Sequence, residues 1–278
     1  MMFKQKVNSS DLVNRYPAIF AESEKENLSD KYLYIPTYKL LQGLESQGFE
    51  IIGAKQQGTR SNNREHAKHV VYLSHPSLNQ EKALKVGEEL PMIALTNSHN
   101  GLSSFAIDTA FFRLACSNGL LMPTTKMNSA RIVHKIGMQN DVIEAATRVV
   151  QEFPEQVRKI NEMKNIALNR DEQMLLADSA SRLVFEDDQL DLNKERGVNI
   201  PLKMLHVRRS QDTAQNLWTT FNVIQENIIK GGHRVLTQNE QGQRSITKMR
   251  PVKSIDRDAK LNRELMRLAQ EMAKIKTA

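Results

Sequence analysis

The chain has 278 residues and a formal net charge of +7, and its 40% hydrophobic and 26% charged residues are typical of a globular protein with a sizeable core. No run of about 18 apolar residues occurs, and the N-terminus leads straight into polar sequence, so we expect a cytoplasmic protein that neither spans a membrane nor is exported. The single cysteine, Cys116, excludes an internal disulfide, and its apolar neighbours favour a small buried side chain over a catalytic thiol.

The first part of the chain predicts a short helix followed by strands. Leucines at helical spacing between Thr37 and Gly48 predict a helix that the threonine caps and the glycine ends. Three strand-like runs then cover residues 49–55, 69–73 and 91–96. A polar segment separates the first two of these runs.

A dense polar turn follows the third strand, and Asp108 then stands where the N-cap of a helix is expected. The pattern predicts a helix over residues 109–118, which Asn118 and Gly119 end because both residue types tolerate the left-handed conformation. The order of elements through residue 119 is therefore helix, strand, strand, strand, helix.

After Pro123 the hydrophobic pattern becomes helical. It predicts helices over residues 141–153, 154–168, 170–185, 212–229 and 256–274, with Pro154 at a permitted first-turn position. The acidic stretch 186–191 is interpreted as a loop or linker, and residues 234–253 as the segment with the strongest indication of mobility.

Together these elements predict an α+β fold in which a small antiparallel sheet, a strand meander, packs on helices and is followed by a helical C-terminal part. We expect a mixed α/β core domain over residues 1–125 and a helical layer over residues 126–230 that packs on this core. A basic segment and the C-terminal helix would occupy residues 231–278.

The positive charge is concentrated near the C-terminus. Residues 230–278 contain 12 Lys and Arg against 5 Asp and Glu, so the remaining chain holds 27 residues of each sign and is neutral (39 less 12, and 32 less 5). A local positive field attracts a polyanion, and nucleic acid is the commonest polyanion in a cytoplasm. A solvated basic tail without a partner is the alternative.

A second group of cations flanks the loop between the first two strands. If the strands pair as a meander, these cations would share one basic rim with the polar turn, and phosphates need both charge and hydrogen-bonding side chains. The residues expected to bind nucleic acid are Lys55, Arg60, Arg64, Lys68, Asn97, His99, Asn100 and Arg113 on this rim, and Lys230, His233, Arg234, Lys248, Arg250 and Lys253 as a C-terminal anchor. Candidate platforms for stacking bases are Tyr32, Tyr34, Tyr38, Tyr72 and Phe105.

An enzymatic or metal site is less well supported. Four histidines, His66, His69, His75 and His99, suggest metal ligands, but residues three apart on a strand point to opposite faces, and no cysteine or acidic cluster completes a site. Ser98 or Ser103 with His99 as a base would need an oriented carboxylate, for which only Asp108 is available. We therefore expect no enzyme, no metal and no other cofactor.

The main alternative is a protein-protein interaction module that blocks or recruits a host or phage factor. Its docking face would be the amphipathic helix over residues 212–229, which contains Trp218. This alternative requires an exposed apolar stripe on that helix. Burial of Trp218 in an ordinary core is the simpler interpretation.

Six longer motifs resemble the YfjQ/YafZ family of prophage- and plasmid-borne proteins. They are Arg15–Pro17, Tyr32–Thr37, Arg64–His69, Asn97–Ser104, Phe112–Leu120 and Gln225–Gly232, and they run almost from end to end. The resemblance implies a protein of a bacterial mobile genetic element, but no activity, because the family is a domain of unknown function without established catalytic residues. Asn100 stands where the family is expected to prefer aspartate, which argues against a scheme that needs a carboxylate in this turn.

The order of elements in a basic protein also looks like the core of the single-strand annealing recombinases, the phage RecT/Erf/Redβ group and their eukaryotic relatives. This resemblance implies rings or filaments of subunits and a groove that holds a sugar-phosphate backbone with its bases exposed. We therefore expect an oligomeric protein that binds single-stranded DNA in homologous recombination and anneals it without covalent chemistry.

Overall fold

The computed structural model describes residues 9–23, 34–59, 64–78, 89–100, 105–113, 119–122, 130–132, 138–210 and 212–277. The chain divides into two compact units, unit 1 over residues 1–156 and unit 2 over residues 157–278. These units differ from the three expected segments with boundaries after residues 125 and 230. The boundary falls inside helix α3 (Met138–Asn165), and residues 231–278 join the helices that precede them.

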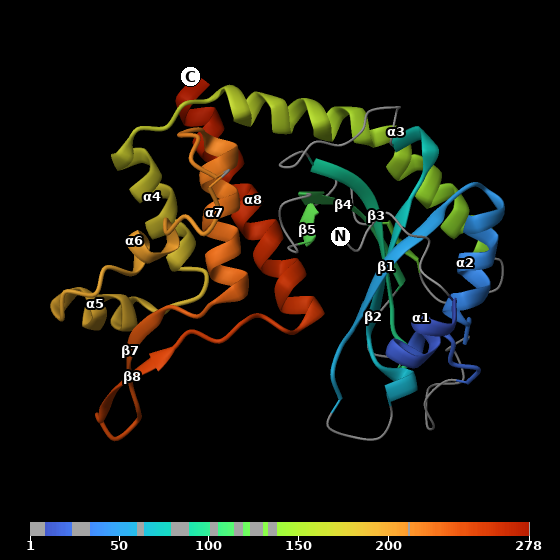
Figure 1. Cartoon of the computed structure of the whole chain (residues 1–278), viewed down its shortest axis with the longest axis horizontal. Coiled ribbons are helices and arrows are strands. Elements are labelled where there is room, and N and C mark those ends of the chain that lie inside the picture. The colour runs from blue at the N-terminus through green and yellow to red at the C-terminus, as the bar shows by residue number, and fades with distance from the viewer. Residues whose placement is uncertain are drawn as a thin grey trace. The chain divides into compact units, whose positions relative to one another are not determined.

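A six-stranded antiparallel sheet forms the centre of unit 1 (Figure 1). Its strands are β1 (Glu50–Gln56), β2 (His69–Ser74), β3 (Glu89–Asn97), β4 (Phe105–Arg113), β5 (Gly119–Met122) and β6 (Ala130–Ile132). The first four strands pair in chain order, and β5 and β6 both pair with β4. This meander confirms the expected α+β fold with a small antiparallel sheet.

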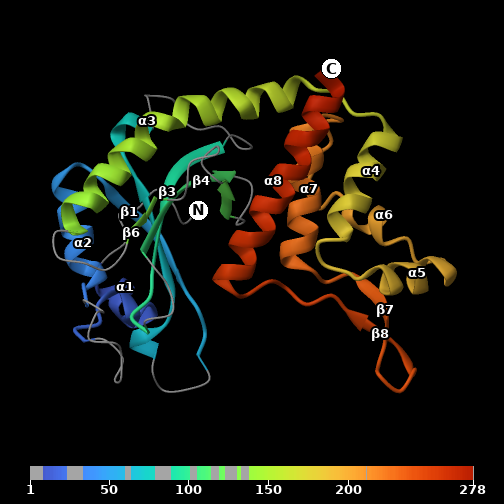
Figure 2. The ribbon, with the colours of Figure 1, turned by 180° about the vertical axis from the view of Figure 1, so that it is seen from behind.

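Helices cover one side of this sheet. Helix α2 (Thr37–Ser46) confirms the first expected helix, and it lies on the same side of the sheet as the first half of α3 (Figures 1 and 2). Gly43 of α2 approaches α3 so closely that an added Cβ would lie 3.7 Å from Ile143. Phe153 of α3 packs edge-on against Phe111 of β4, with ring centroids 5.3 Å apart.

The helix expected over residues 109–118 is wrong, because β4 occupies Phe105–Arg113. In β4 the buried residues Phe105 and Ile107 alternate with half-buried Ala106 and Asp108, which is the period of a strand. Asp108 pairs with Ala94 of β3 and does not cap a helix. Residues 114–118, including Cys116, lie outside the described residues. The element order that carried the recombinase resemblance is therefore not the order in the structure.

Unit 2 is built around helix α7 (Leu217–Lys230), whose residues from Leu217 to Ile228 are all buried. It packs against α4 (Arg170–Ser181), α6 (Ile200–Met204) and α8 (Ile255–Thr277). Trp218 is only 2% exposed and stacks on Phe221 at 5.4 Å between centroids. The side chain considered for a docking face is therefore part of the core of unit 2.

Three local expectations for the second half are corrected. Helix α3 continues through Pro154 instead of breaking there, and buried Val149, Phe153 and Ile160 on both sides of the proline offset its missing hydrogen bond. The acidic stretch starts helix α5 (Asp187–Glu195), because carboxylates favour a helix N-terminus. The segment expected to be mobile forms a hairpin of β7 (Arg234–Gln238) and β8 (Arg244–Lys248).

The other expected helices are present with shifted ends. Helix α7 begins after Asn216, whose side chain accepts a hydrogen bond from the Thr219 amide, and ends at Gly231 with φ of 61°. Helix α8 confirms the C-terminal helix. Within the described residues, no helix is long and apolar enough to cross a membrane.

Candidate functional site

A buried polar cluster fixes the turn that follows β3 in unit 1. The Thr37 hydroxyl oxygen lies 2.8 Å from His69 Nε2, 2.9 Å from Asn97 Nδ2 and 3.3 Å from His99 Nε2. All four side chains are fully buried. Thr37 was expected to cap α2, but its side chain makes no cap hydrogen bond and instead joins the helix to two strand ends.

The hydrogen-bond roles in this cluster are determined by the backbone. His69 Nδ1 lies 2.9 Å from the Ala67 carbonyl and must donate to it, so Nε2 accepts the Thr37 hydroxyl proton. His99 Nε2 lies 3.0 Å from the Ala18 carbonyl and donates to it. Burial lowers the pKa of His69 to about 4, so its ring is neutral at pH 7.

The basic rim that the sequence predicts, the cations around the β1–β2 loop together with the polar turn after β3, lies partly at one end of the sheet. The Arg64 carbonyl accepts a hydrogen bond of 2.8 Å from Gln56 Nε2, and the Lys68 carbonyl accepts one of 2.8 Å from the Gln57 amide. Arg64 is exposed, whereas Lys55 and Lys68 are half-buried. Because Asn97 pairs with His69, the polar turn reaches the same end of the sheet. Arg60 lies outside the described residues.

One rim residue, Arg113, deviates from this arrangement. Arg113 pairs with Glu89, while Thr96, the neighbour of Asn97, pairs with Ala106 at the other end of β3 and β4. At about 3.3 Å per residue, a seven-residue separation along a strand corresponds to roughly 23 Å, so the Arg113 backbone is remote from the turn. Asn100 is half-buried and accepts a hydrogen bond of 2.6 Å from the Ser98 hydroxyl.

The four histidines do not assemble a metal site in the described residues. His69 and His99 have ring centroids 5.3 Å apart, but the Nε2 atoms of both contact Thr37. His75 packs on Phe49 at 4.7 Å between centroids. In the part of the chain that the structure describes, no group of three or more His, Cys, Asp or Glu side chains could hold a metal ion.

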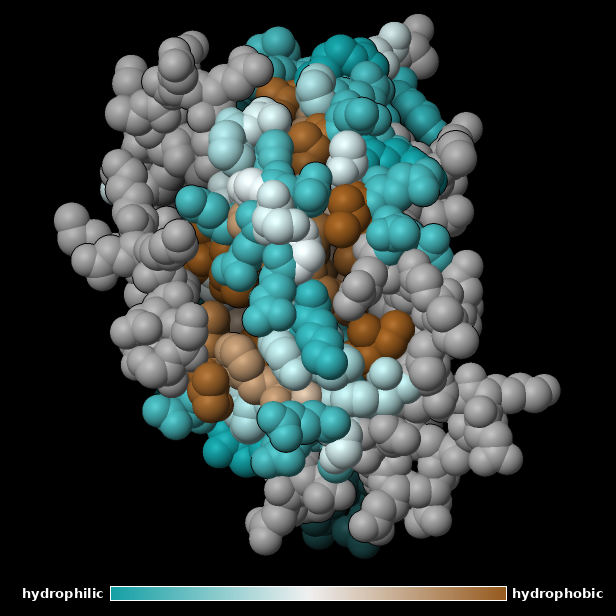
Figure 3. All heavy atoms as spheres, turned by 90° about the vertical axis from the view of Figure 1, so that its right-hand side faces the viewer, coloured by the Kyte–Doolittle hydropathy of each residue, from teal (hydrophilic) through white to brown (hydrophobic). Residues whose placement is uncertain are grey.

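Figure 3 shows the side of the molecule on which α2 lies in Figure 1. Among its coloured residues, hydrophilic ones form a central ridge and separate the hydrophobic ones on either side. The coloured part of this face therefore presents no continuous apolar patch.

In unit 2, the charge of Lys230 is used inside the fold. Its Nζ lies 2.6 Å from Glu226 Oε1, and Arg209 Nη2 lies 2.8 Å from the same oxygen. Glu226 is 3% exposed. Although burial acts to raise the pKa of Glu226, the hydrogen bonds from Arg209 and Lys230 lower it below its ordinary value. This network joins the end of α7 to Arg209 in the segment between α6 and α7.

His233 belongs to a neighbouring network around Asn227. Asn227 Oδ1 lies 2.7 Å from Arg208 Nε and 2.8 Å from His233 Nε2, and Arg208 also donates to the Gly231 carbonyl at 2.6 Å. Partial burial and the positive charge of Arg208 lower the pKa of His233 to about 4. Gly231 has φ of 61°, and an added Cβ would lie 2.5 Å from the Met249 carbonyl oxygen. These contacts hold both ends of the β7–β8 hairpin.

The hairpin and its flanks carry exposed positive charge. Six cations are exposed there: Arg234, Arg244, Lys248, Arg250, Lys253 and Arg257. Within the described residues, none of the six makes an ion pair with a carboxylate. Figure 1 shows the tip of the hairpin extending beyond the helices of unit 2, while β7 lies beside α5.

The strand register places one apolar pair between two polar pairs on one face of the hairpin. Arg234 pairs with Lys248, Leu236 with Ile246, and Gln238 with Arg244. Ile246 is 69% exposed. Two like charges directly opposite each other destabilise a strand pair, so this arrangement is costly without a bound anion. The sequence-based list of binding residues omits Arg244 and Arg257. The strand register places Arg244 on the same face as Arg234 and Lys248, and Arg257 lines a pocket together with Lys248 and Arg250.

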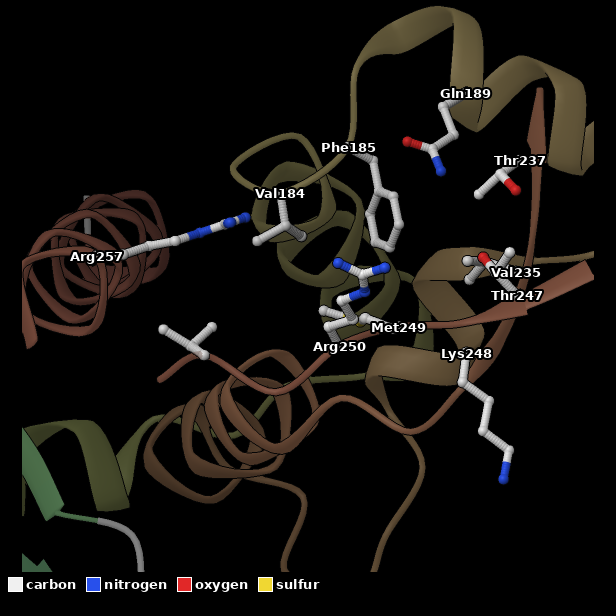
Figure 4. Close-up of a pocket in the computed structure, with 11 residues that line it drawn as sticks. Val184, Phe185, Gln189, Val235, Thr237, Thr247, Lys248, Met249, Arg250 and Arg257 are labelled. Atoms are coloured by element: carbon white, nitrogen blue, oxygen red, sulfur yellow. The ribbon is translucent and has the colours of Figure 1, made fainter. Parts of the chain in front are cut away.

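The other face of the hairpin borders a pocket of about 390 Å³ (Figure 4). Val235, Thr237 and Thr247 line it from the strands, Val184 and Phe185 from the segment between α4 and α5, and Gln189 from α5. The remaining lining residues are Lys248, Met249, Arg250, Val252 and Arg257. Among the described residues, the lining therefore holds three basic side chains and no acidic one.

Comparisons with known proteins place these features in a family context. A family model described as "Domain of unknown function (DUF932)" matches residues 26–266. The chain is 35% identical over 263 residues to "UPF0380 protein YafZ" of Escherichia coli (strain K12), which covers 94% of this chain and 90% of that protein. "UPF0380 protein YfjQ" of the same strain matches with the same identity and coverage. No solved structure matches, and the comparisons do not support the recombinase resemblance.

Proposed function

The chain belongs to the DUF932 family and is a relative of YafZ and YfjQ, and from the geometry of its own hairpin we propose that it is a nucleic-acid-binding protein. The observation that carries this proposal is the set of six exposed cations on the β7–β8 hairpin and its flanks, none of which makes an ion pair with a described carboxylate. Binding and positioning of a strand require no catalytic residue.

The phosphate backbone is the ligand that suits this surface. Lys and Arg side chains neutralise phosphates and release condensed counterions, which supplies most of the affinity of sequence-independent binding. The opposed pair of Arg234 and Lys248 would gain stability when a phosphate lies between the two charges. A projecting two-stranded ribbon exposes such charges to a strand without rearrangement of the helices.

Single-stranded DNA is the form we favour. Ile246 lies between the two polar pairs and is 69% exposed, so an unpaired base could cover it while the flanking cations contact phosphates. A two-stranded ribbon also fits the major groove of a duplex, so the preference is a result to be measured. Annealing of complementary strands, assembly into oligomers and a role in the recombination of a prophage or plasmid in a bacterial cytoplasm extend this proposal.

Fluorescence anisotropy with labelled single-stranded and duplex oligonucleotides of equal length at two salt concentrations tests the proposal. We expect the triple variant Arg234→Gln, Arg244→Gln and Lys248→Gln to weaken binding and to reduce the slope of log K against log salt by about 2, since each lost phosphate contact to a single strand contributes roughly 0.7. Addition of the complementary strand to the bound complex then measures annealing.

A charge-matched control removes three exposed cations that are already paired with carboxylates. Arg148, Arg158 and Arg182 make ion pairs with Glu144, Glu162 and Asp178. Their replacement by glutamine should leave affinity close to that of the wild type. Absence of binding at low salt, or equal effects of the two triple variants, would refute the proposal.

A further inference from the structure

Contacts between the exposed cations and the phosphate backbone of a bound strand would not involve the pocket behind the hairpin. We infer that it is a nucleotide subsite, which receives one base of the bound strand while Arg250 and Arg257 hold the phosphate of that nucleotide. This inference rests on the proposed function and specifies it further. A pocket of about 390 Å³ lies within the size range of small-molecule sites, roughly 300–1,000 Å³.

The wall and floor of the pocket suit a base. Phe185 supplies an aromatic ring that is 8% exposed, and Val184, Val235 and Val252 add aliphatic surface around it. Every base has an apolar face that stacks on such groups without regard to its identity. An elongated anion without an apolar part would leave this surface uncovered.

The cations at the rim of the pocket suit a phosphate. In Figure 4 the Arg250 side chain points toward the Phe185 ring, and the Arg257 guanidinium points toward Val184. Lys248 points away from the pocket, on the side of the hairpin where the backbone contacts are proposed. Arg250 and Arg257 therefore converge on the pocket from the end of the hairpin and the first turn of α8.

Neutral polar groups complete the lining, and no carboxylate of the described residues lies among them. Gln189, Thr237 and Thr247 carry amide and hydroxyl groups that can meet the polar edge of a base. Asp256 and Asp258 flank Arg257 in the sequence but do not line the pocket. The chemistry of this lining is that of an anionic ligand with a planar, partly apolar body.

The test compares a single-stranded oligonucleotide with an abasic oligonucleotide of the same length and charge, using the full chain at low salt. For the wild type we expect the normal strand to bind roughly tenfold more tightly, the size expected for one stacked base. Because Arg250 and Arg257 would position the nucleotide whose base enters the pocket, the pocket variant Arg250→Gln with Arg257→Gln should release that base and bring this ratio close to one. The matched control Lys253→Gln with Lys260→Gln removes two exposed cations outside the pocket and should lower both affinities while the ratio persists.

The outcomes separate this inference from the function on which it rests. A ratio that collapses in the pocket variant and persists in the control supports the nucleotide subsite. A wild-type ratio near one, or a ratio that the pocket variant retains, overturns the subsite but leaves backbone binding by the hairpin intact. Failure of both oligonucleotides to bind at low salt overturns both proposals. We expect both double variants to fold, since all four substituted side chains are exposed. Circular dichroism checks this.

Discussion

The Thr37 hydroxyl connects three buried polar side chains. It donates to His69 and accepts from Asn97, and it lies 3.3 Å from His99 Nε2, whose proton is donated to the Ala18 carbonyl. A buried polar group that loses its partner costs more than the hydrogen bond itself contributes. The polar turn that begins at Asn97 is therefore fixed by buried hydrogen bonds. Its buried side chains, Asn97 and His99, could affect a ligand only by setting the conformation of the turn.

The neutral ring of His69 makes the stability of unit 1 depend on pH. Its folded pKa of about 4 lies below the ordinary value of 6.5, so the unfolded chain binds more protons between these values. Stability is therefore full above about pH 6.5 and decreases as the pH falls toward 4, by up to about 3 kcal/mol.

Urea denaturation at pH 7.5 and pH 5 measures this loss. The variant His69→Gln keeps a side chain that can donate to Ala67 and accept from Thr37 but cannot titrate, so its loss between the two pH values should be clearly smaller. His233 titrates in the same direction, so some pH dependence should persist in the variant. Equal pH dependence in the two proteins would show that His69 is not the group responsible.

At the scale of elements, the hairpin depends on a contact across 43 residues. Asn193 of α5 accepts from the Leu236 amide at 2.8 Å and donates to the Leu236 carbonyl at 2.9 Å, and so pairs with β7 as a neighbouring strand would. The side chain is fully buried. The polar and small residues of the segment 234–253 indicate mobility when they are considered alone. The local sequence does not show that Asn193, 43 residues earlier than Leu236, binds this segment.

A local sequence pattern does not reveal contacts between distant residues, and this explains which elements the sequence predicts correctly. The helix at Thr37, the strands over 49–55, 69–73 and 91–96, and the C-terminal helix follow from local periodicity, and the structure confirms them. At Asp108 a local capping signal conflicts with pairing between β4 and its neighbours, and the pairing prevails. For the candidate site, the sequence indicates where cations are abundant but not which of them are neutralised by partners.

We expect Asn193→Ala to loosen the hairpin without unfolding the helices of unit 2. Loss of two hydrogen bonds to a buried amide should cost about 1–3 kcal/mol. Hydrogen exchange should become faster for the amides of residues 234–238, and oligonucleotide affinity should fall if the hairpin is the interface. Asn161→Ala, an exposed position on α3, is the control and should change neither measurement. Unchanged exchange in β7 would contradict the role given to Asn193.

At the scale of the whole molecule, the distribution of charge differs from the count along the sequence. Four cations of the C-terminal segment make ion pairs with carboxylates: Lys230, Arg267, Lys274 and Lys276. The other eight make none with a described carboxylate, and six of these eight lie on the hairpin and its flanks. The uncompensated positive field of this segment is therefore strongest around the hairpin, although the net charge alone would spread it over the last helix as well.

Unit 1 carries the exposed Arg64 beside the half-buried Lys68, so the proposed nucleic-acid contacts fall on both units of one chain, and a strand bound at both would be held through two linked surfaces. Linked contacts raise the overall affinity without a change in either surface, whereas a strand that covers only one surface gains nothing from the other. We therefore expect Arg64→Ala with Lys68→Ala to weaken a long single strand several-fold and to leave a strand of about five nucleotides, close to the smallest site sizes of single-strand-binding folds, within a factor of two. Competition anisotropy with unlabelled strands of both lengths measures these affinities. An equal loss for both lengths would mean that the rim lies within the primary site, and no loss for the long strand would exclude the rim from the interface.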